Sequence, residues 1–355
     1  MAPTHLSRLH ETTWEENILF SALLELTYKC NLDCFFCYND LGLEGEPLSR
    51  QQYFDLLTDL AEMQVMNVIL SGGEPLAHPD FFEIGSRARE LGFVVRVKSN
   101  GHALRGSLAQ RLVDEVDPFV VEVSLHGATA ETHDRQTRVP GSFARLCSNV
   151  RGMVEIGLRV KINSTLTRWN ETEMPAMFDL AKDFGVPLAV DAMVTPRDNG
   201  DRSPLEIAPT HAGRIGLYAE MRSREQLPSA EAECAPSPGT KKNCGAGAST
   251  VAIDPFGNIY PCVQWRRPLG NLHKSPIGTI WQSSPGLAEV RRVNEEVGET
   301  VQDMAAQGMR VYHCMGLSEE LEGDPKAVNP RALDNATLKK GVQDGGKRNP
   351  LPIVY

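Results

Sequence analysis

Between residues 20 and 195 the chain alternates short apolar runs with amphipathic segments, and this alternation constrains its fold more than any other feature. Each apolar run is rich in Val, Ile, Leu or Phe, which is typical of strands buried on both faces of a parallel sheet. Parallel strands are joined by helices, so the pattern predicts an α/β fold. The six predicted strands are Phe20–Leu26, Asn67–Leu70, Phe93–Lys98, Phe119–Leu125, Leu158–Leu166 and Pro187–Val194.

The segments between these strands have helical periodicity. In Arg50–Met63 apolar residues recur at i, i+3, i+4 spacing, and Ser49 suits the N-cap. Six strands alternating with helices indicate right-handed βα units, either in a doubly wound sheet or in an incomplete barrel. Because a closed TIM barrel has eight units, we predict an open, partial (β/α)6 TIM-like barrel over residues 20–205. The other predicted helices are Asp80–Leu91, Ser107–Val116, Ser142–Ile156 and Thr172–Phe184.

The remaining residues are expected to form smaller units around this barrel. Residues 1–19 are an N-terminal extension, and residues 206–243, rich in Pro, Ser and charge, are a linker with one helix near Thr210–Gln226. Residues 244–325 form a second, smaller α+β domain, in which a Pro-Phe-Gly-Asn turn joins two β-prone runs into a hairpin. The polar residues 326–355 are expected to be a tail that is mobile or draped on the surface.

The charge balance and the N-terminus limit the possible partners. With 36 basic and 46 acidic residues, the chain has a formal charge of −10 and no basic field for nucleic acid or anionic lipid. The first twenty residues contain no signal-peptide core, and the most apolar stretch, Ile18–Leu26, is too short for a membrane span. We therefore expect a cytoplasmic protein with no nucleic-acid or membrane partner.

Eight cysteines are present, which is high for a cytosolic chain, where clustered Cys more often bind metal than form disulfides. Three of them lie within eight residues, one lies alone in a predicted helix among apolar residues, and four lie in the last third. Two distant cysteine regions fit two metal sites better than one disulfide framework. The three groups are Cys30, Cys34 and Cys37; Cys147, which we expect in the core; and Cys234, Cys244, Cys262 and Cys314.

The first three cysteines follow the first strand directly. Three thiolates at the carboxyl end of a strand can converge on one soft metal centre. A zinc site would normally need a fourth ligand close by, and none follows in the pattern. An iron–sulfur cubane held by three thiolates would leave one iron open to a small molecule. On spacing alone, a small zinc site or buried thiols remain the alternatives.

Polar residues and glycines follow the next three strands. The second strand leads into the motif SGGEP, where Gly72 and Gly73 allow close approach of the backbone to a ligand and Glu74 can accept a hydrogen bond from an ammonium group. The third and fourth strands end in KSNG and SLHG, which puts polar side chains at the rim where barrel enzymes build their sites. His126 in SLHG is more typical of a structural hydrogen-bonding residue than of a proton donor.

The pattern Cys-x3-Cys-x-aromatic-Cys, with Phe36 as the aromatic, resembles the radical S-adenosylmethionine (SAM) enzymes. The resemblance implies that Cys30, Cys34 and Cys37 hold a 4Fe–4S cluster whose fourth iron chelates SAM. Relatives often use an arginine for the SAM carboxylate, which here would be Arg138 or Arg135. The other implied SAM-binding residues are Phe36 beside the adenine, Gly72, Gly73 and Glu74 at the amino group, and Ser99, Asn100 and Ser124 near the methionine or ribose, with Asn163 a weaker candidate.

The second cysteine group resembles the auxiliary-cluster domain called SPASM, or its shortened form twitch. Cys244-x12-Gly257-x4-Cys262 matches its opening, and a hairpin turning at Gly257 can bring the two thiolates together. Only Cys314 follows, so the resemblance implies one auxiliary iron–sulfur cluster, of the 4Fe–4S type. Cys234 is the preferred fourth ligand; an acidic or amide side chain, or an open iron that binds substrate, is the alternative. Otherwise Cys234 is a loop thiol and Cys314 a core residue.

The resemblance also implies a chemistry. An external flavodoxin- or ferredoxin-type donor reduces the first cluster, SAM is cleaved to a 5′-deoxyadenosyl radical, and that radical abstracts hydrogen from the substrate. An auxiliary cluster favours net oxidation, and members with this second domain often modify peptides or proteins. We therefore predict a peptide-modifying enzyme of the peptide-maturation type. Because twenty residues cannot form a leader-binding domain, a separate leader-binding protein could serve this role.

Two other functions stay open. One is oxidation of a small molecule in cofactor or antibiotic biosynthesis, and the other is a non-catalytic iron–sulfur carrier. The GGEP and SLHG motifs argue against a carrier, which needs no SAM site. The sequence identifies no catalytic proton or hydrogen donor. Trp169, Trp265 and Trp281 either line a substrate channel or pack half-buried.

Overall fold

A nine-stranded sheet runs through the computed structural model, which describes residues 5–226 and 241–343. Its order is β6-β5-β4-β3-β2-β1-β7-β8-β9, and the first six strands are parallel to their neighbours. Each predicted strand is present, so the expected partial barrel of βα units is confirmed. The six strands are β1 (Ser21–Glu25), β2 (Asn67–Ser71), β3 (Val94–Ser99), β4 (Val120–Ser124), β5 (Val160–Thr165) and β6 (Leu188–Asp191).

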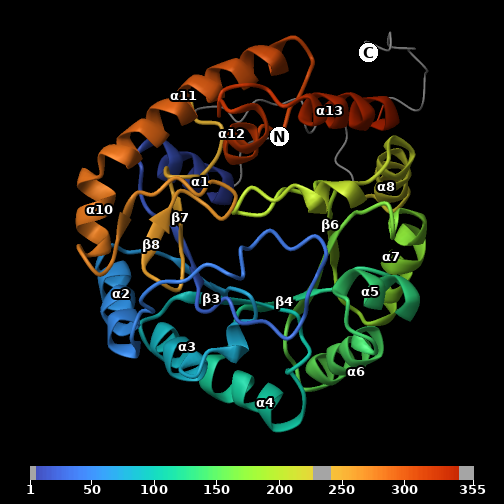
Figure 1. Ribbon diagram of the computed structural model, residues 1–355, viewed down its shortest axis with the longest axis horizontal. Helices are drawn as coiled ribbons and strands as arrows, with labels where there is room; N and C mark the ends of the chain where they lie inside the picture. The colour runs from blue at the N-terminus through green and yellow to red at the C-terminus, as the bar shows by residue number, and fades with distance from the viewer. Residues whose placement is uncertain (1–4, 227–240, 344–355) are drawn as a thin grey trace.

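Helices form a ring around this sheet (Figure 1). The predicted helix at 107–116 divides into α4 (Gly106–Arg111) and a π-helical turn (Leu112–Val116) that ends at the left-handed residue Asp117. Helix α5 (Ala130–Thr137) was not predicted, because its polar sequence has no apolar stripe. The other barrel helices are α2 (Arg50–Glu62), α3 (Phe81–Glu90), α6 (Ser142–Glu155) and α7 (Met174–Asp183), with 3₁₀ turns at Pro75–Ala77, Glu171–Glu173 and Ser203–Ile207.

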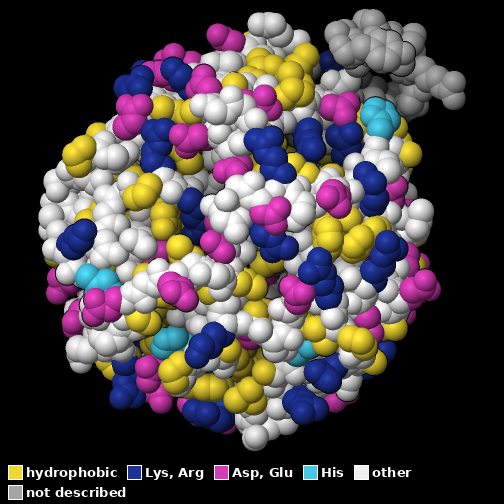
Figure 2. Space-filling model, viewed as in Figure 1, with side chains coloured by type: hydrophobic (Ala, Val, Ile, Leu, Met, Phe, Trp, Pro, Cys, Tyr) yellow, Lys and Arg dark blue, Asp and Glu magenta, His cyan; other side chains and the backbone are white. Residues whose placement is uncertain are grey.

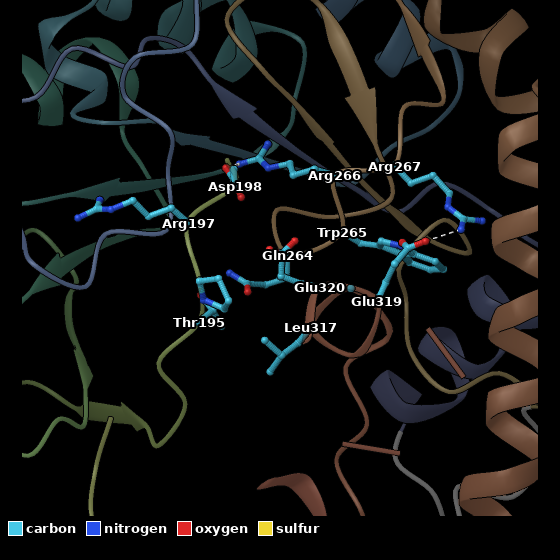
Figure 3. A pocket seen from close by; sticks show the side chains of 12 residues that line it. Thr195, Arg197, Asp198, Gln264, Trp265, Arg266, Arg267, Leu317, Glu319 and Glu320 are labelled. Atoms are coloured by element: carbon cyan, nitrogen blue, oxygen red, sulfur yellow. Dashed lines mark hydrogen bonds and ion pairs between the residues drawn. The ribbon is translucent and has the colours of Figure 1, made fainter. Parts of the chain in front are cut away.

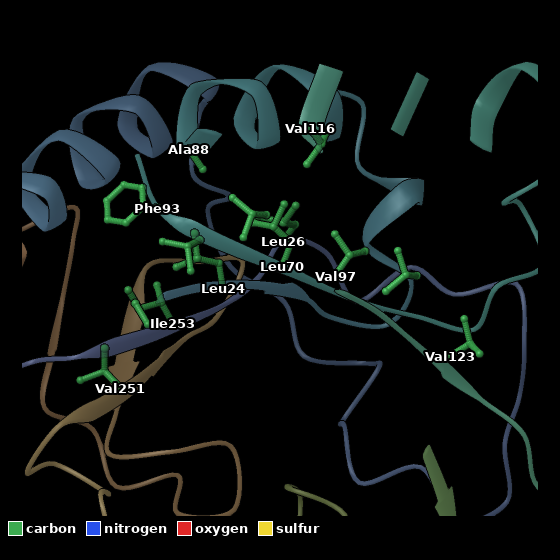
Figure 4. Packing of buried hydrophobic residues seen from close by; sticks show 14 of the residues in the cluster. Leu24, Leu26, Leu70, Ala88, Phe93, Val97, Val116, Val123, Val251 and Ile253 are labelled. Atoms are coloured by element: carbon green, nitrogen blue, oxygen red, sulfur yellow. The ribbon is translucent and has the colours of Figure 1, made fainter. Parts of the chain in front are cut away.

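Only one face of the parallel sheet packs against the helices. Leu24, Leu70, Val97 and Val123 are fully buried on that face and form part of one apolar cluster (Figure 4). Burial alternates along β3, so that every second side chain points to the barrel interior instead. The expectation that these strands are buried on both faces is therefore wrong, because the inner face lines an open interior and carries polar residues.

The second cysteine region extends the same sheet. β7 (Thr250–Ile253) pairs in parallel with β1, and β8 (Asn258–Tyr260) and β9 (Gly270–Asn271) follow antiparallel. Gly257 turns the β7–β8 hairpin with a φ of 76°, as the motif predicts. Three helices complete this region: α10 (Ile277–Ser283), α11 (Pro285–Ala306) and α12 (Met315–Glu322).

Helices also lie at the two ends of the chain and in the predicted linker. α1 (His5–Glu15) lies within the N-terminal extension, and α8 (His211–Ser223) is the helix expected near residues 210–226. α13 (Pro330–Gln343) packs on α8, with Arg214 donating hydrogen bonds to Asp334 and Asn335 at 2.5 and 2.6 Å. Residues 330–343 of the predicted tail thus form a helix that lies on the surface. No helix among the described residues is long and apolar enough to cross a membrane.

Candidate functional site

The loop of Cys30, Cys34 and Cys37 leaves the carboxyl end of β1 and is fixed by backbone contacts. The Cys37 N–H donates to the Cys34 carbonyl at 3.1 Å, which makes a tight turn around the last two thiols. Arg197, beyond β6, donates to the carbonyls of Phe35 and Cys37 at 3.1 and 3.0 Å. Sequence reasoning missed Arg197, because no local pattern connects residues so far apart.

The three thiols share a partly buried environment in which their charged forms repel one another. Burial raises the pKa of each thiol, that of Cys37 to about 11. The pKa of Cys34 is raised further by Cys37 and Cys30, so the three lie within one another's field. A cluster of iron ions would hold all three as thiolates and remove this repulsion. The donor set therefore fits a soft iron–sulfur centre.

The SGGEP motif packs directly on the cysteine loop. Gly72 has a φ of 137°, and a Cβ placed on it would lie 2.3 Å from the Thr27 carbonyl oxygen. A Cβ on Gly73 would lie 2.7 Å from the carbonyl oxygen of Tyr28. The backbone that the glycines approach is thus the chain's own loop, at the entry to the first cysteine. Any side chain here would displace that loop.

Glu74 connects the ends of three strands. Its buried carboxylate accepts hydrogen bonds from the Ser99 hydroxyl at 2.9 Å and the Asn100 N–H at 2.8 Å. Burial raises the pKa of Glu74 to about 7 against these opposing hydrogen bonds. The Asn100 amide in turn donates to Asn31 at 2.8 Å and to the Cys30 sulfur at 3.8 Å. The structure thus brings Glu74, Ser99 and Asn100 together beside the first cysteine.

Phe36 and the fourth strand end lie on the other side of the loop. The Phe36 ring meets the His126 ring edge-on at 4.5 Å, and Ser124 ends β4 opposite Asn163. Burial lowers the pKa of His126 to about 3, with His133 adding to the effect, so His126 is neutral. Its Nδ1 accepts a hydrogen bond from the Thr165 N–H at 3.4 Å, in keeping with a structural role.

Each of the two candidate arginines lies over an aromatic ring. Arg138 lies 3.1 Å from the Asp33 carboxylate and 4.8 Å above the Phe35 ring. Arg135 lies 4.1 Å above the ring of Trp169, which packs on Phe35. Arg138 therefore contacts the cysteine loop directly, while Arg135 reaches it through Trp169.

The second cysteine group lines one cavity of about 520 Å³. Cys244, Cys262 and Cys314 all face it, and burial together with the other two thiols raises the pKa of Cys262 to about 12. The structure brings these three together as the sequence predicts, while Cys234 lies outside the described residues. Cys147 is a buried residue of the apolar core, as expected.

Asn294 on α11 fixes the loop that carries Cys244. This fully buried side chain accepts hydrogen bonds from the N–H groups of Asn243 and Cys244 at 2.9 and 3.2 Å. Its amide donates to the carbonyls of Cys244 and Ala246 at 2.9 and 3.0 Å. A buried side chain with four hydrogen bonds holds its loop in one conformation. Sequence reasoning missed it, since a lone Asn in a helix carries no signal.

A buried ion-pair network joins the two cysteine regions. Arg266, four residues beyond Cys262, makes a bidentate pair with Glu25 at 2.9 Å for both nitrogens, and Glu25 is the last residue before the first cysteine loop. Arg266 also pairs with Asp198 at 2.9 Å. Figure 3 shows Arg266 and Asp198 pointing toward each other at a cavity of about 370 Å³, while the Arg197 side chain extends away from them. This network couples the ends of both loops mechanically.

Among the described residues, no group of three or more His, Cys, Asp or Glu side chains is placed to hold a single metal ion. The two thiol groups instead combine soft donors, partial burial and charged forms that repel one another, which suits multi-iron clusters.

Comparison with known proteins shows which families the chain matches. A model described as the radical SAM superfamily matches residues 24–181, and one described as an iron–sulfur cluster-binding domain matches residues 244–303. The PqqA peptide cyclase of Streptomyces rochei is 30% identical, covering 93% of this chain and 96% of that protein. The AdoMet-dependent heme synthase of Methanosarcina barkeri (strain Fusaro / DSM 804) is 26% identical, covering 86% of this chain and 95% of that protein.

A solved structure shares the fold. Native anSMEcpe with bound AdoMet and Cp18Cys peptide superposes with a TM-score of 0.66 at 14% identity, covering 92% of this chain and 96% of that one. The chain belongs to the radical SAM superfamily and carries the iron–sulfur domain of its SPASM branch. Its cofactors are SAM, a 4Fe–4S cluster and an auxiliary iron–sulfur cluster.

Proposed function

We propose that Cys30, Cys34 and Cys37 hold the 4Fe–4S cluster and that Cys244, Cys262 and Cys314 hold the auxiliary one. The observation that carries this assignment is the presence of two partly buried three-thiol groups on loops of one continuous sheet. When bound, the first cluster and SAM supply a 5′-deoxyadenosyl radical that can remove hydrogen from an unreactive carbon. Cys234 is our preferred fourth ligand of the auxiliary cluster.

We propose that residues around the first cysteine loop position SAM. Glu74, Ser99 and Asn100 form a buried hydrogen-bonded set beside Cys30, and we assign them, with Gly72 and Gly73, to the methionine end of SAM. Phe36 and Ser124 are assigned to the adenine and ribose side. Arg138 is assigned to the SAM carboxylate, since its contact with Asp33 keeps it at the cysteine loop.

For the substrate, we propose oxidative modification of a peptide or protein side chain. Support comes from the PqqA peptide cyclase, which matches nearly the whole chain at 30% identity. A second candidate is oxidation of a small molecule of the tetrapyrrole kind, which the similarity to a heme synthase favours. A flavodoxin- or ferredoxin-type donor and, for a peptide, a separate leader-binding protein complete the proposal. The seven free thiols in the described residues suit a reducing compartment such as the cytoplasm.

The test is iron content together with SAM cleavage. Anaerobically reconstituted wild type is expected to hold about eight irons per chain and to form 5′-deoxyadenosine with dithionite. Replacing Cys30, Cys34 and Cys37 with Ala should leave about four irons and abolish cleavage. Replacing Cys244, Cys262 and Cys314 should remove the other irons, whereas the control Cys147→Ala should keep all of them. Zinc in place of iron, or no cleavage by fully loaded protein, would refute the assignment.

A further inference from the structure

A row of charged side chains crosses the barrel interior below the strand ends. Lys98 on β3, Glu122 on β4 and Lys161 on β5 are direct partners in the sheet register. Residues paired in this way point to the same side, and the burial pattern of β3 and β5 places that side toward the interior. Arg96 lies one layer deeper on the same face of β3. Of these four residues only Lys98, the first residue of KSNG, belongs to one of the sequence motifs.

Glu122 already has its partners. Its side chain is only 3% exposed, and it accepts hydrogen bonds from Arg96 and, at 2.6 Å, from the Asn163 amide. Lys98 is farther away, at 3.9 Å, and its side chain is 43% exposed to the interior. The other carboxylates on this face are engaged elsewhere: Glu25 with Arg266, and Asp191 with the Met193 N–H. One carboxylate thus stands among three cations.

Burial and the excess positive charge together lower the pKa of Lys98. Burial lowers the pKa of Lys98, and Arg96 and Lys161 lower it further against the opposing effect of Glu122. An anion within reach of both lysines, beyond the Glu122 carboxylate that stands between them, would relieve this repulsion. Over the face shown in Figure 2, basic and acidic side chains are interspersed.

Arg96, below the row, reaches the auxiliary cysteines. Arg96 lines the 520 Å³ cavity together with Cys244, Cys262 and Cys314. The Arg96 Nε is buried and has no hydrogen-bond partner within the described residues. The interior therefore carries donors for an anion along a line that connects the lysines with this cavity.

We propose that Lys98 and Lys161 bind a carboxylate of the substrate and hold the substrate between the SAM site and the auxiliary cysteines. This inference rests on the proposed function and adds a substrate class, a carboxylate-bearing molecule. The carboxylate comes either from an acidic peptide side chain or from a propionate of a tetrapyrrole. Both sources present the same group to the two lysines, and the experiment separates them.

The experiment measures binding to anaerobic holoenzyme by calorimetry with two probe pairs. One pair is coproporphyrin III, which has four propionates, and its tetramethyl ester. The other is an acetylated Gly-Glu-Gly-Glu-Gly amide and its Gln counterpart. The double variant Lys98→Met/Lys161→Met removes two charges and leaves Glu122 with Arg96 and Asn163. Lys182→Met, at an exposed lysine of α7, is the matched control.

We expect one carboxylate probe to bind wild type at least about tenfold more tightly than its neutral counterpart. This preference should disappear in the double variant and persist in Lys182→Met, and the pair that shows it identifies the source. Equal binding within both pairs, or a preference that survives the double variant, would overturn the proposal. So would an equal loss of SAM affinity in the double variant, because the lysines would then serve the SAM carboxylate.

Wild-type cleavage of SAM is measured in the same preparations. Absence of 5′-deoxyadenosine from wild type would refute the proposed function, whereas normal cleavage without carboxylate preference would refute only the substrate class. Circular dichroism and iron content check that the double variant has folded and loaded its clusters.

Discussion

Replacing Arg266 with Met should destabilise the protein far more than the same change at the neighbouring Arg267. Arg266 neutralises Glu25, whose side chain is fully buried, through two hydrogen bonds of 2.9 Å. Glu25 also accepts hydrogen bonds from the hydroxyls of Tyr28 and Tyr38 at 3.0 and 3.4 Å, which are donors without charge. The variant would therefore leave a carboxylate inside the protein with no cation to pair with.

The magnitude follows from this burial. Removing one partner of a buried ion pair costs about 3–5 kcal/mol, because the remaining charge is uncompensated. Arg267 pairs with Glu319, and their side chains are 30% and 32% exposed, so its loss should cost at most about 1 kcal/mol. Adding Glu25→Gln to Arg266→Met should recover part of the loss, since it removes the buried charge.

The assay is the free energy of unfolding from anaerobic urea curves of wild type, both single variants and the double variant. Tryptophan fluorescence and circular dichroism should report the same transition. Iron content is a second measurement, because Glu25 leads directly into the first cysteine loop. If Arg266→Met and Arg267→Met differ by less than about 1 kcal/mol, the buried pair does not hold the two regions together and the reasoning is wrong.

Three further predictions concern single sites. Asn294→Ala leaves buried groups near Cys244 unpaired, so it should lower the free energy of unfolding in urea by about 2–4 kcal/mol. In a chain whose first three cysteines are Ala, it should also lower the iron content. Full iron content in that chain would contradict the prediction. Gly73→Ala should lower the iron retained by a chain whose auxiliary cysteines are Ala, because a Cβ would meet the loop backbone at 2.7 Å. Gly152→Ala, with nothing within 4 Å, is its control. Burial lowers the pKa of His126 to about 3 and of His133 to about 4 from a usual 6.5, so the unfolded chain binds more protons between pH 6.5 and 4. The free energy of unfolding should therefore fall as the pH drops through that window. If it falls as steeply in a His133→Gln variant as in wild type, His133 is not a cause.

Several features were predictable because they are encoded locally. The strands, the β7–β8 hairpin and the two cysteine groups each follow from residues within a short window, through periodicity, turn chemistry or ligand spacing. The inner-face charges were also visible, as Arg96 and Lys98, or Lys161 and Asn163, alternate with apolar residues. Reading the strands as buried on both faces concealed that signal. Helix α5 was not predicted, because its buried side chains are polar and hydrogen-bonded and its apolar residues show no helical spacing.

The sequence by itself determined the class of chemistry and the order of the elements, since both depend on short-range patterns. Only the tertiary structure decided that β7 joins β1 in one sheet and that Arg197, Arg266 and Asn294 hold the cysteine loops. Arg266 is 241 residues from Glu25, and Arg197 is 160 residues from Cys37. Each such contact depends on where distant backbone segments meet after packing. The local sequence around a single charged or amide side chain does not predict its partner.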